Sequence, residues 1–280
     1  MNNPPADPLF DTALLRRSVI HALSNPLCLE ALLQNDGCTL DDRTSSVLLL
    51  LGELPLERGD IPEVCVILNK RSKEVRQPGD LCCPGGAVEK LDRILARILS
   101  FHGSSLSKWP CWRQLKTEQP GNAQLLSMLY AAGVREAWEE MRLNPFMLTF
   151  LGPLPTHCLS FFGRTIHPMV AWVSRQKRFR LSWEVERIVQ FPLRALLDPF
   201  NYGMYRLYVP PHLEWRFGGD STRNLPCFIY KSAGWAEVLW GATFRIVTQF
   251  LEIVFGFQVP DIEKLPLVPA SVDDEYVRRQ

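Results

Sequence analysis

Three glutamates near the middle of the chain have the spacing of a metal site. Glu136, Glu139 and Glu140 lie in the stretch Arg-Glu-Ala-Trp-Glu-Glu-Met-Arg-Leu, and on a helix the i, i+3, i+4 spacing places them on one face. Crowded carboxylates repel one another, and a hard divalent cation such as Mg²⁺ would neutralise them through oxygen ligands. In isolation, such a run is more often a solvated acidic surface. The rest of the sequence has to decide between these interpretations.

The composition of the 280 residues is that of an ordinary globular protein. Hydrophobic residues make up 46% and charged residues 22%, which is enough for a sizeable core. The net charge of +1 provides no global basic field, so we expect neither a nucleic acid nor a membrane as partner. No apolar run reaches the length of a membrane span.

The cysteines indicate a reducing compartment. All eight are scattered, and no pair has the C-x-x-C spacing of a zinc site. Cys65 and Cys227 lie beside apolar residues and are expected to be small core side chains. The first residues lack the basic and apolar regions of a secretory signal peptide. We therefore expect a cytoplasmic protein.

The three glutamates end a predicted long helix, Asn122–Met141, which stops before Asn144-Pro145. Residues 102–121 read as irregular. Short strands interspersed with helices suggest a mixed sheet covered by helices. The other predicted helices are Leu14–Leu23, Leu91–Phe101, Pro192–Leu197 and Ala242–Phe255. The predicted strands are Ser46–Leu51, Glu63–Leu68, Phe146–Leu151, Ile166–Ser174, Tyr205–Val209 and Phe228–Tyr230.

A loop upstream of the helix could face a phosphate. It ends in Pro84-Gly85-Gly86, where glycine lets the backbone approach a ligand closely and could free the Gly86 carbonyl to bind a metal. Arg71 and Arg76 supply guanidinium groups suited to phosphate oxygens, and Lys70 is adjacent. The plain alternative is a tight turn with solvated basic residues.

Together, these segments resemble the Nudix hydrolase family, whose signature is Gly-x5-Glu-x7-Arg-Glu-U-x-Glu-Glu-x-Gly-U, with U bulky and apolar. The matches to its second half are Arg135, Glu136, Ala137, Glu139, Glu140 and Leu143. Other matches resemble the coenzyme A diphosphatase branch: Arg71-Ser72, Arg76, Gly79, Pro84-Gly85-Gly86, Phe191–Pro199 and Trp240–Thr243. The resemblance covers roughly residues 43–255 and implies an α+β fold, an α/β/α sandwich around a central mixed sheet.

The signature is split by an insertion. Gly86 and Arg135 are separated by 48 residues, far more than the pattern needs, so residues 90–120 read as an insertion. It could form a lid whose tryptophans stack a base, or a self-association surface that uses the apolar stripe Leu91–Leu99. The third interpretation is that this stripe is covered by the chain's own core.

Two further departures concern single residues. Counting back from Arg135 puts Ser127 where the pattern has its first Glu, and Gly121 where it has its first Gly. Glu89 is a candidate to replace the lost carboxylate. Arg142 stands where Gly normally closes the helix, a position that favours a left-handed backbone.

The resemblance implies metal-dependent hydrolysis of a nucleoside diphosphate linkage. It assigns Mg²⁺ or Mn²⁺ to Glu136, Glu139, Glu140 and Gly86, catalytic roles to Glu136, Glu139 and Arg135, and substrate binding to Arg71, Arg76 and Lys70. Arg135 would orient the glutamates, and Glu136 is either a metal ligand or the base that activates water. Coenzyme A or an acyl-CoA is the first substrate hypothesis. The alternatives are ADP-ribose, NADH or a dinucleotide as substrate, or an inactive ligand-binding domain.

The expected organisation has three parts. Residues 1–42 form an N-terminal helical lead, residues 43–258 the Nudix domain and residues 259–280 a mobile tail. The predicted partner is a small nucleotide. Assembly into a homodimer is left open.

Overall fold

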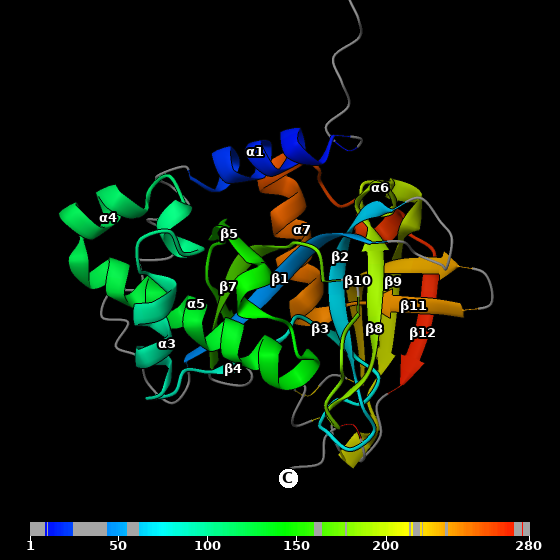
Figure 1. The fold of residues 1–280 in the computed structure, drawn as a ribbon. Helices are drawn as coiled ribbons and strands as arrows, with labels where there is room; N and C mark the ends of the chain where they lie inside the picture. Colours follow the sequence, from blue (N-terminus) through cyan, green and yellow to red (C-terminus); the bar gives the residue numbers. More distant parts are fainter. Residues whose placement is uncertain are drawn as a thin grey trace, which may run out of the picture.

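The computed structural model describes residues 9, 11–24, 44–54, 62–159, 164–176, 178–212, 214, 219, 221–232, 235–271 and 276. These residues form a mixed α+β fold with two β-sheets, drawn in Figure 1. The helices are α1 (Thr12–Leu23), α3 (Asp92–Leu99), α4 (Trp112–Glu118), α5 (Pro120–Met141), α6 (Leu193–Leu196) and α7 (Gly241–Phe255). The strands are β1 (Thr44–Leu54), β2 (Glu63–Arg71), β3 (Leu81–Cys82), β4 (Gly85–Ala87), β5 (Leu148–Pro153), β6 (His157–Leu159), β7 (Arg164–Val173), β8 (Val185–Pro192), β9 (Tyr202–Tyr208), β10 (Thr222–Ser232), β11 (Trp235–Leu239) and β12 (Leu267–Ser271).

Strand β1 forms the centre of the larger sheet, whose main order is β3-β2-β1-β7-β5. It runs parallel to β7 and antiparallel to β2, so the sheet is mixed. Leu48 and Leu50 pack in the cluster that contains α5, whereas Leu49 and Leu51 pack in the cluster that contains α1 and α7. Burial on both faces explains why this strand is apolar without alternation. Helices therefore cover both faces of the sheet, as the resemblance implied (Figure 1).

Helix α5 lies close against β1. A Cβ atom at Gly133 would come within 2.9 Å of Leu48 Cδ2, so glycine at this position permits the close approach. That contact offsets the helix-propensity cost of glycine, about 1 kcal/mol relative to alanine. Ala137 and Met141, farther along the helix, are 0% exposed. The packing fixes the rotation of α5 and thereby decides which way its last turns present the glutamates.

The inserted residues fold onto α5. Residues 102–121 were expected to be irregular, but they contain α4, where Trp112 and Leu115 are buried. Trp109 is 2% exposed and packs edge-on against Phe150, with ring centroids 5.5 Å apart. Both tryptophans are core residues rather than exposed platforms for a base. The irregular prediction failed because short helical turns lack the length that makes periodicity visible.

A second sheet has the order β11-β10-β9-β12. Its last strand, β12, runs parallel to β9 and lies within the 259–280 segment that was expected to be a mobile tail. Tyr276 also packs against the ring of Trp240, with centroids 6.2 Å apart. These parts of the segment are therefore ordered, because backbone pairing and aromatic contacts offset the cost of fixing them.

Most of the predicted elements that position the glutamates are confirmed to within a few residues, including α1, α5 and α7. Strand β8 was not predicted, because the charged pair Glu186-Arg187 interrupts its alternation of buried residues. Cys65 and Cys227 are both 0% exposed, as expected of core side chains. Within the described part of the chain, no helix is both long and apolar enough to cross a membrane.

Candidate active site

The last turns of α5 gather the predicted acidic residues around Arg135. Its Nη1 atom donates to Glu136 Oε1 at 3.0 Å and to Glu139 Oε2 at 3.2 Å. Its Nη2 atom donates to the carbonyl oxygen of Ala87 in β4 at 2.9 Å. Arg135 therefore ties the acidic face of α5 to the glycine-containing strand β4. Charge-assisted hydrogen bonds of this kind are strong enough to hold side chains in place.

Asp92, at the start of α3, is the main carboxylate partner of Arg135. Its Oδ1 atom accepts from Arg135 Nε at 2.8 Å, and its side chain is 0% exposed. Asp92 also accepts from the backbone N–H of Glu89 at 2.7 Å, which fixes the turn into α3. The Glu89 carboxylate lies 3.9 Å from Arg135, and its side chain is 55% exposed. Of the two carboxylates, Asp92 is thus the one that Arg135 contacts directly, and Glu89 is the more distant.

The sequence contained a signal for Asp92. Counting forward from Gly86, the position of the first Glu in the Gly-x5-Glu pattern is residue 92. Counting back from Arg135 leads instead to Ser127, whose hydroxyl donates to the carbonyl of Gln124 in its own helix at 2.8 Å. The insertion therefore falls after Asp92, within the x7 part of the signature, and both halves of the pattern are present.

Of the three predicted glutamates, Glu140 has the pKa that is shifted furthest. One of its oxygens, Oε2, accepts from Asn69 Nδ2 in β2 at 2.6 Å, and a backbone N–H of Gly85 also donates to this carboxylate. Burial, and then the neighbouring Glu136, raise the pKa of Glu140 to about 8. No Lys or Arg in the described ranges forms an ion pair with it. This partly buried carboxylate therefore lacks the positive partner that charges removed from water normally require.

Glu184, just before β8, joins the same cluster. Its charge raises the pKa values of both Glu136 and Glu140, although burial is the larger cause in each case. No local pattern marks this residue in the sequence, because a loop far along the chain brings it to α5. It adds a fourth carboxylate to the three that were predicted.

The side chains around Glu140 offer oxygen atoms, which are the ligands that a hard divalent cation prefers. Glu140 has no positive partner, and Asn69, whose Nδ2 atom donates to it, has a buried Oδ1 atom without a hydrogen-bond partner. Within the described residues, however, no three His, Cys, Asp or Glu side chains already converge on a point that could hold a metal ion. Arg135 holds Glu136 and Glu139 through one nitrogen atom. We infer that metal binding requires the Glu139 side chain, which is 52% exposed, to turn away from Arg135.

The three predicted substrate-binding residues do not lie together. Lys70 points to the opposite side of β2 from Asn69, since neighbouring strand residues alternate. Its Nζ atom lies 2.8 Å from Glu237 Oε1, and Glu237 also pairs with Arg187. Lys70 is therefore paired with the second sheet, and its role in substrate binding stays a prediction.

Arg71 lies on the acidic side of the β2–β3 hairpin. It hydrogen-bonds to Cys82, whose thiol pKa is also raised by the nearby charge of Glu140 after the larger effect of burial. Its Nε atom donates to the carbonyl of Arg76 at 2.6 Å. Arg76 is exposed. Arg71 and Glu140 are thus both neighbours of Cys82, and Arg76 lies at the solvent side of the same loop.

Arg142 closes the end of α5. Arg142 takes the left-handed conformation, with φ 52° and ψ 38°, that the pattern normally gives to glycine. Its guanidinium lies 5.4 Å from the ring centroid of Trp138. Trp138 is 45% exposed. In the last two turns of α5 only Ala137 and Met141 are buried, whereas residues 126–134 are buried all round the helix.

No protein-family model matches the chain, and no curated protein matches its sequence. Among solved structures, an Ap4A hydrolase from C. elegans is 14% identical, with 55% of this chain and 82% of that chain covered and a TM-score of 0.33. A Nudix hydrolase from Alicyclobacillus acidocaldarius is 15% identical, with 57% and 83% covered and a TM-score of 0.35. The Nudix domain of NrtR from Shewanella oneidensis, complexed with ADP ribose, is 13% identical, with 59% and 83% covered and a TM-score of 0.32. These values are too low to assign a family or an activity.

Replacing Gly86 with Ala should impair metal binding while preserving the fold. A Cβ atom there would lie 2.6 Å from the Cδ atom of Glu136, so the carboxylate has to move. Because that group is the far end of a flexible side chain, we expect little loss of stability but a loss of about tenfold or more in Mn²⁺ affinity, measured by calorimetry. Gly121→Ala is the matched control, since a Cβ atom at that position meets nothing within 4 Å. Equal affinities of the two variants would contradict the placement of Gly86 in the site.

Metal affinity should rise with pH. Glu140 must lose a proton to bind a cation, and its pKa of about 8 means that this proton is largely present at pH 6. Apparent Mn²⁺ affinity should therefore rise by up to about tenfold per pH unit as the pH approaches 8. Calorimetry in buffers of different ionisation enthalpy would detect the released proton. An affinity that does not change between these pH values would show that Glu140 is not a ligand.

Proposed function

We propose that this protein hydrolyses a diphosphate linkage within a nucleotide, with Mg²⁺ or Mn²⁺ as cofactor. The observation that supports it is the partly buried carboxylate of Glu140, which has no positive partner within the described residues and lies beside Glu136. The hydrogen bond from Arg135 to Asp92 fixes the arginine beside the acidic face of the helix. Arg135 neutralises part of the charge of Glu136 and Glu139, but a structural role alone gives no reason to leave Glu140 beside them without a positive partner.

The proposed roles follow from position. Glu136, Glu139 and Glu140 hold the cation, with the Gly86 carbonyl as a further oxygen ligand. A bound divalent cation neutralises phosphate oxygens and makes water more acidic. Arg135 holds Glu136 and Glu139 in place through its hydrogen bonds. Glu136 is the predicted group that accepts the proton of the attacking water when it does not serve as a ligand.

Coenzyme A or an acyl-CoA is the proposed substrate. Water adds to one phosphorus atom and the bridging P–O bond breaks, which gives 3′,5′-ADP and phosphopantetheine. Arg71, near the acidic cluster, is the group we assign to the diphosphate, with Arg76 at the solvent side of the loop. The segments Phe191–Pro199 and Trp240–Thr243, which resemble the coenzyme A diphosphatase branch, support this choice.

One observation favours a second substrate class. Lys70 is paired with Glu237, so fewer cations remain for the 3′-phosphate of coenzyme A than the sequence suggested. ADP-ribose, NADH or a dinucleotide, which lack that phosphate, are therefore the alternative. The inactive-domain hypothesis rested on Ser127 and Arg142. It is weakened, because Asp92 supplies the first carboxylate and Arg142 adopts the left-handed helix end.

A panel of coenzyme A, an acyl-CoA, ADP-ribose, NADH and a diadenosine polyphosphate, each with Mg²⁺ and with Mn²⁺, tests the proposal. Coenzyme A or the acyl-CoA should give the highest kcat/KM, with phosphopantetheine products resolved by chromatography. Glu139→Gln should lose turnover with the fold intact. Coenzyme A as the poorest substrate would move the assignment to the second class. Binding without turnover of any compound, under either metal, would identify a ligand-binding domain.

A further inference from the structure

The insertion exposes an apolar surface on α3 and the neighbouring loop. We define the α3 face as Leu91, Ile94, Ile98, Phe101 and Phe146. Their exposed fractions are 66%, 61%, 53%, 73% and 85%. On α3 the buried positions are instead Ala96 and Leu99, so the predicted stripe is divided between core and solvent. Large apolar side chains gathered on one exposed surface mark a binding site for something that removes them from water.

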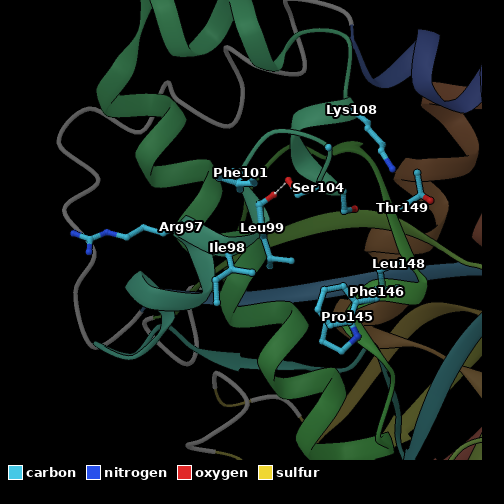
Figure 2. Close-up of a pocket in the computed structure, with 12 residues that line it drawn as sticks. Arg97, Ile98, Leu99, Phe101, Ser104, Lys108, Pro145, Phe146, Leu148 and Thr149 are labelled. Atoms are coloured by element: carbon cyan, nitrogen blue, oxygen red, sulfur yellow. Dashed lines mark hydrogen bonds between the residues drawn. The ribbon is translucent and has the colours of Figure 1, made fainter.

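A hollow opens within this face, between the end of α3 and the start of β5 (Figure 2). Its volume is about 690 Å³, and its lining includes Ile98, Phe101 and Phe146 together with the cations Arg97 and Lys108. In Figure 2 the Arg97 side chain extends outward, away from the apolar lining. The hollow thus combines an apolar floor with positive charge toward solvent.

The insertion is strongly basic. Residues 90–120 contain six Lys and Arg residues and two acidic residues, a net charge of +4, whereas the whole chain carries +1. The six cations, Lys90, Arg93, Arg97, Lys108, Arg113 and Lys116, are all exposed. Of the two acidic residues, Asp92 is buried against Arg135, and Glu118 is exposed at the end of α4. The net charge of the whole chain conceals this local excess of positive charge. For that reason the sequence led us to expect no membrane as partner.

We propose that the α3 face binds the surface of an anionic lipid bilayer. Apolar side chains flanked by Lys and Arg on one helix are the pattern of an interfacial helix, which inserts its apolar residues between headgroups while its cations attract anionic lipids. The hollow beside Ile98 and Phe101 offers space for part of an acyl chain. The association is peripheral and reversible.

A second copy of the chain fits this face less well. In a symmetric dimer the same patch meets itself, so Arg93 and Arg97 of one copy would face those of the other. Like charges brought together in this way oppose association, and the nearest exposed carboxylates in the sequence, Glu89 and Glu118, both lie outside α3. A bilayer that contains phosphatidylserine supplies the opposite charge over the whole patch.

Flotation of the full-length protein with vesicles tests the proposal. Vesicles of phosphatidylcholine with about 30 mol % phosphatidylserine should bind it, phosphatidylcholine alone should bind it poorly, and added salt should release it. Both Ile94→Ser/Ile98→Ser and Arg93→Glu/Arg97→Glu should weaken binding at least about tenfold. The matched controls are Phe200→Ser, at a side chain 92% exposed, and Arg164→Glu, at an exposed arginine outside the insertion. Circular dichroism confirms that each variant is folded.

Three results would overturn the proposal. The first is no binding to the phosphatidylserine vesicles at low salt. The second is binding that Ile94→Ser/Ile98→Ser leaves unchanged, which would indicate charge attraction without insertion of the α3 face. The third is a concentration-dependent dimer, detected by light scattering, that the same double variant dissociates. That outcome would assign the face to contact between copies of the chain.

Discussion

Glu140→Gln should abolish metal-dependent turnover and at the same time make the protein more stable above neutral pH. The amide keeps the size of the carboxylate but cannot neutralise a cation, so kcat should fall by at least about 10²-fold to 10³-fold. The variant should lose turnover but gain stability. The pKa of Glu140 is raised to about 8 by burial, so the folded state disfavours its ionised form.

The sign of that stability effect can be followed with pH. A carboxyl whose pKa is higher in the folded than in the unfolded state makes its full contribution to stability at low pH. That contribution is lost as the pH rises through about 8. Glutamine cannot ionise, so Glu140→Gln should remove this loss. In metal-free buffer at pH 8, the variant should unfold at a higher temperature than the wild type.

Glu252→Gln is the matched control for this experiment. Glu252 lies on α7, away from the acidic face, and is exposed. The Glu252→Gln variant should keep both turnover and stability near the wild-type values. A Glu140→Gln variant that retains turnover would remove Glu140 from the site. A variant that loses turnover by unfolding would show that the carboxylate is structural.

Asp92→Asn should have the largest effect on stability. It removes the negative charge that faces Arg135 at 2.8 Å, at a position that is 0% exposed. Since Arg135 keeps Glu136 and Glu139 as partners, we expect a loss of about 1 to 3 kcal/mol in the free energy of unfolding. Because Arg135 also positions Glu136 and Glu139, kcat should fall as well. Urea denaturation and steady-state kinetics at a temperature where the variant is folded measure the two effects.

Glu89→Gln tests which carboxylate holds the arginine. Glu89 is 3.9 Å from Arg135 and its side chain is 55% exposed, so its loss should cost less than about 1 kcal/mol. If Glu89→Gln were as damaging as Asp92→Asn, the assignment of Asp92 to the first carboxylate position of the signature would be wrong.

The parts of the site that depend on local spacing could be predicted from the sequence. The i, i+3, i+4 pattern placed Glu136, Glu139 and Glu140 on one helix face, and α5 ends at Met141 as expected. The left-handed backbone at Arg142 also agrees with the sequence pattern, in which this position closes the helix. Asp92 was available from the forward spacing but was obscured by the insertion.

The remaining parts depend on contacts between distant segments. Glu184 reaches the cluster only because β8 pairs with β2. Lys70 lies on the other side of the sheet from Asn69, because neighbouring strand residues alternate. The buried Glu237 is on that side and pairs with Lys70. The apolar stripe of α3 was visible, but its periodicity could not show that α5 would cover Leu99 and leave Ile94 exposed.

The most direct test of the central claim is the initial rate of coenzyme A hydrolysis for the wild type and Glu140→Gln, each measured with added Mn²⁺ and with a chelator. We expect turnover only in the wild type with metal, with 3′,5′-ADP and phosphopantetheine formed in equal amounts. Equal rates with metal and with chelator, or in the wild type and the variant, would contradict a metal-dependent site at the acidic face of α5.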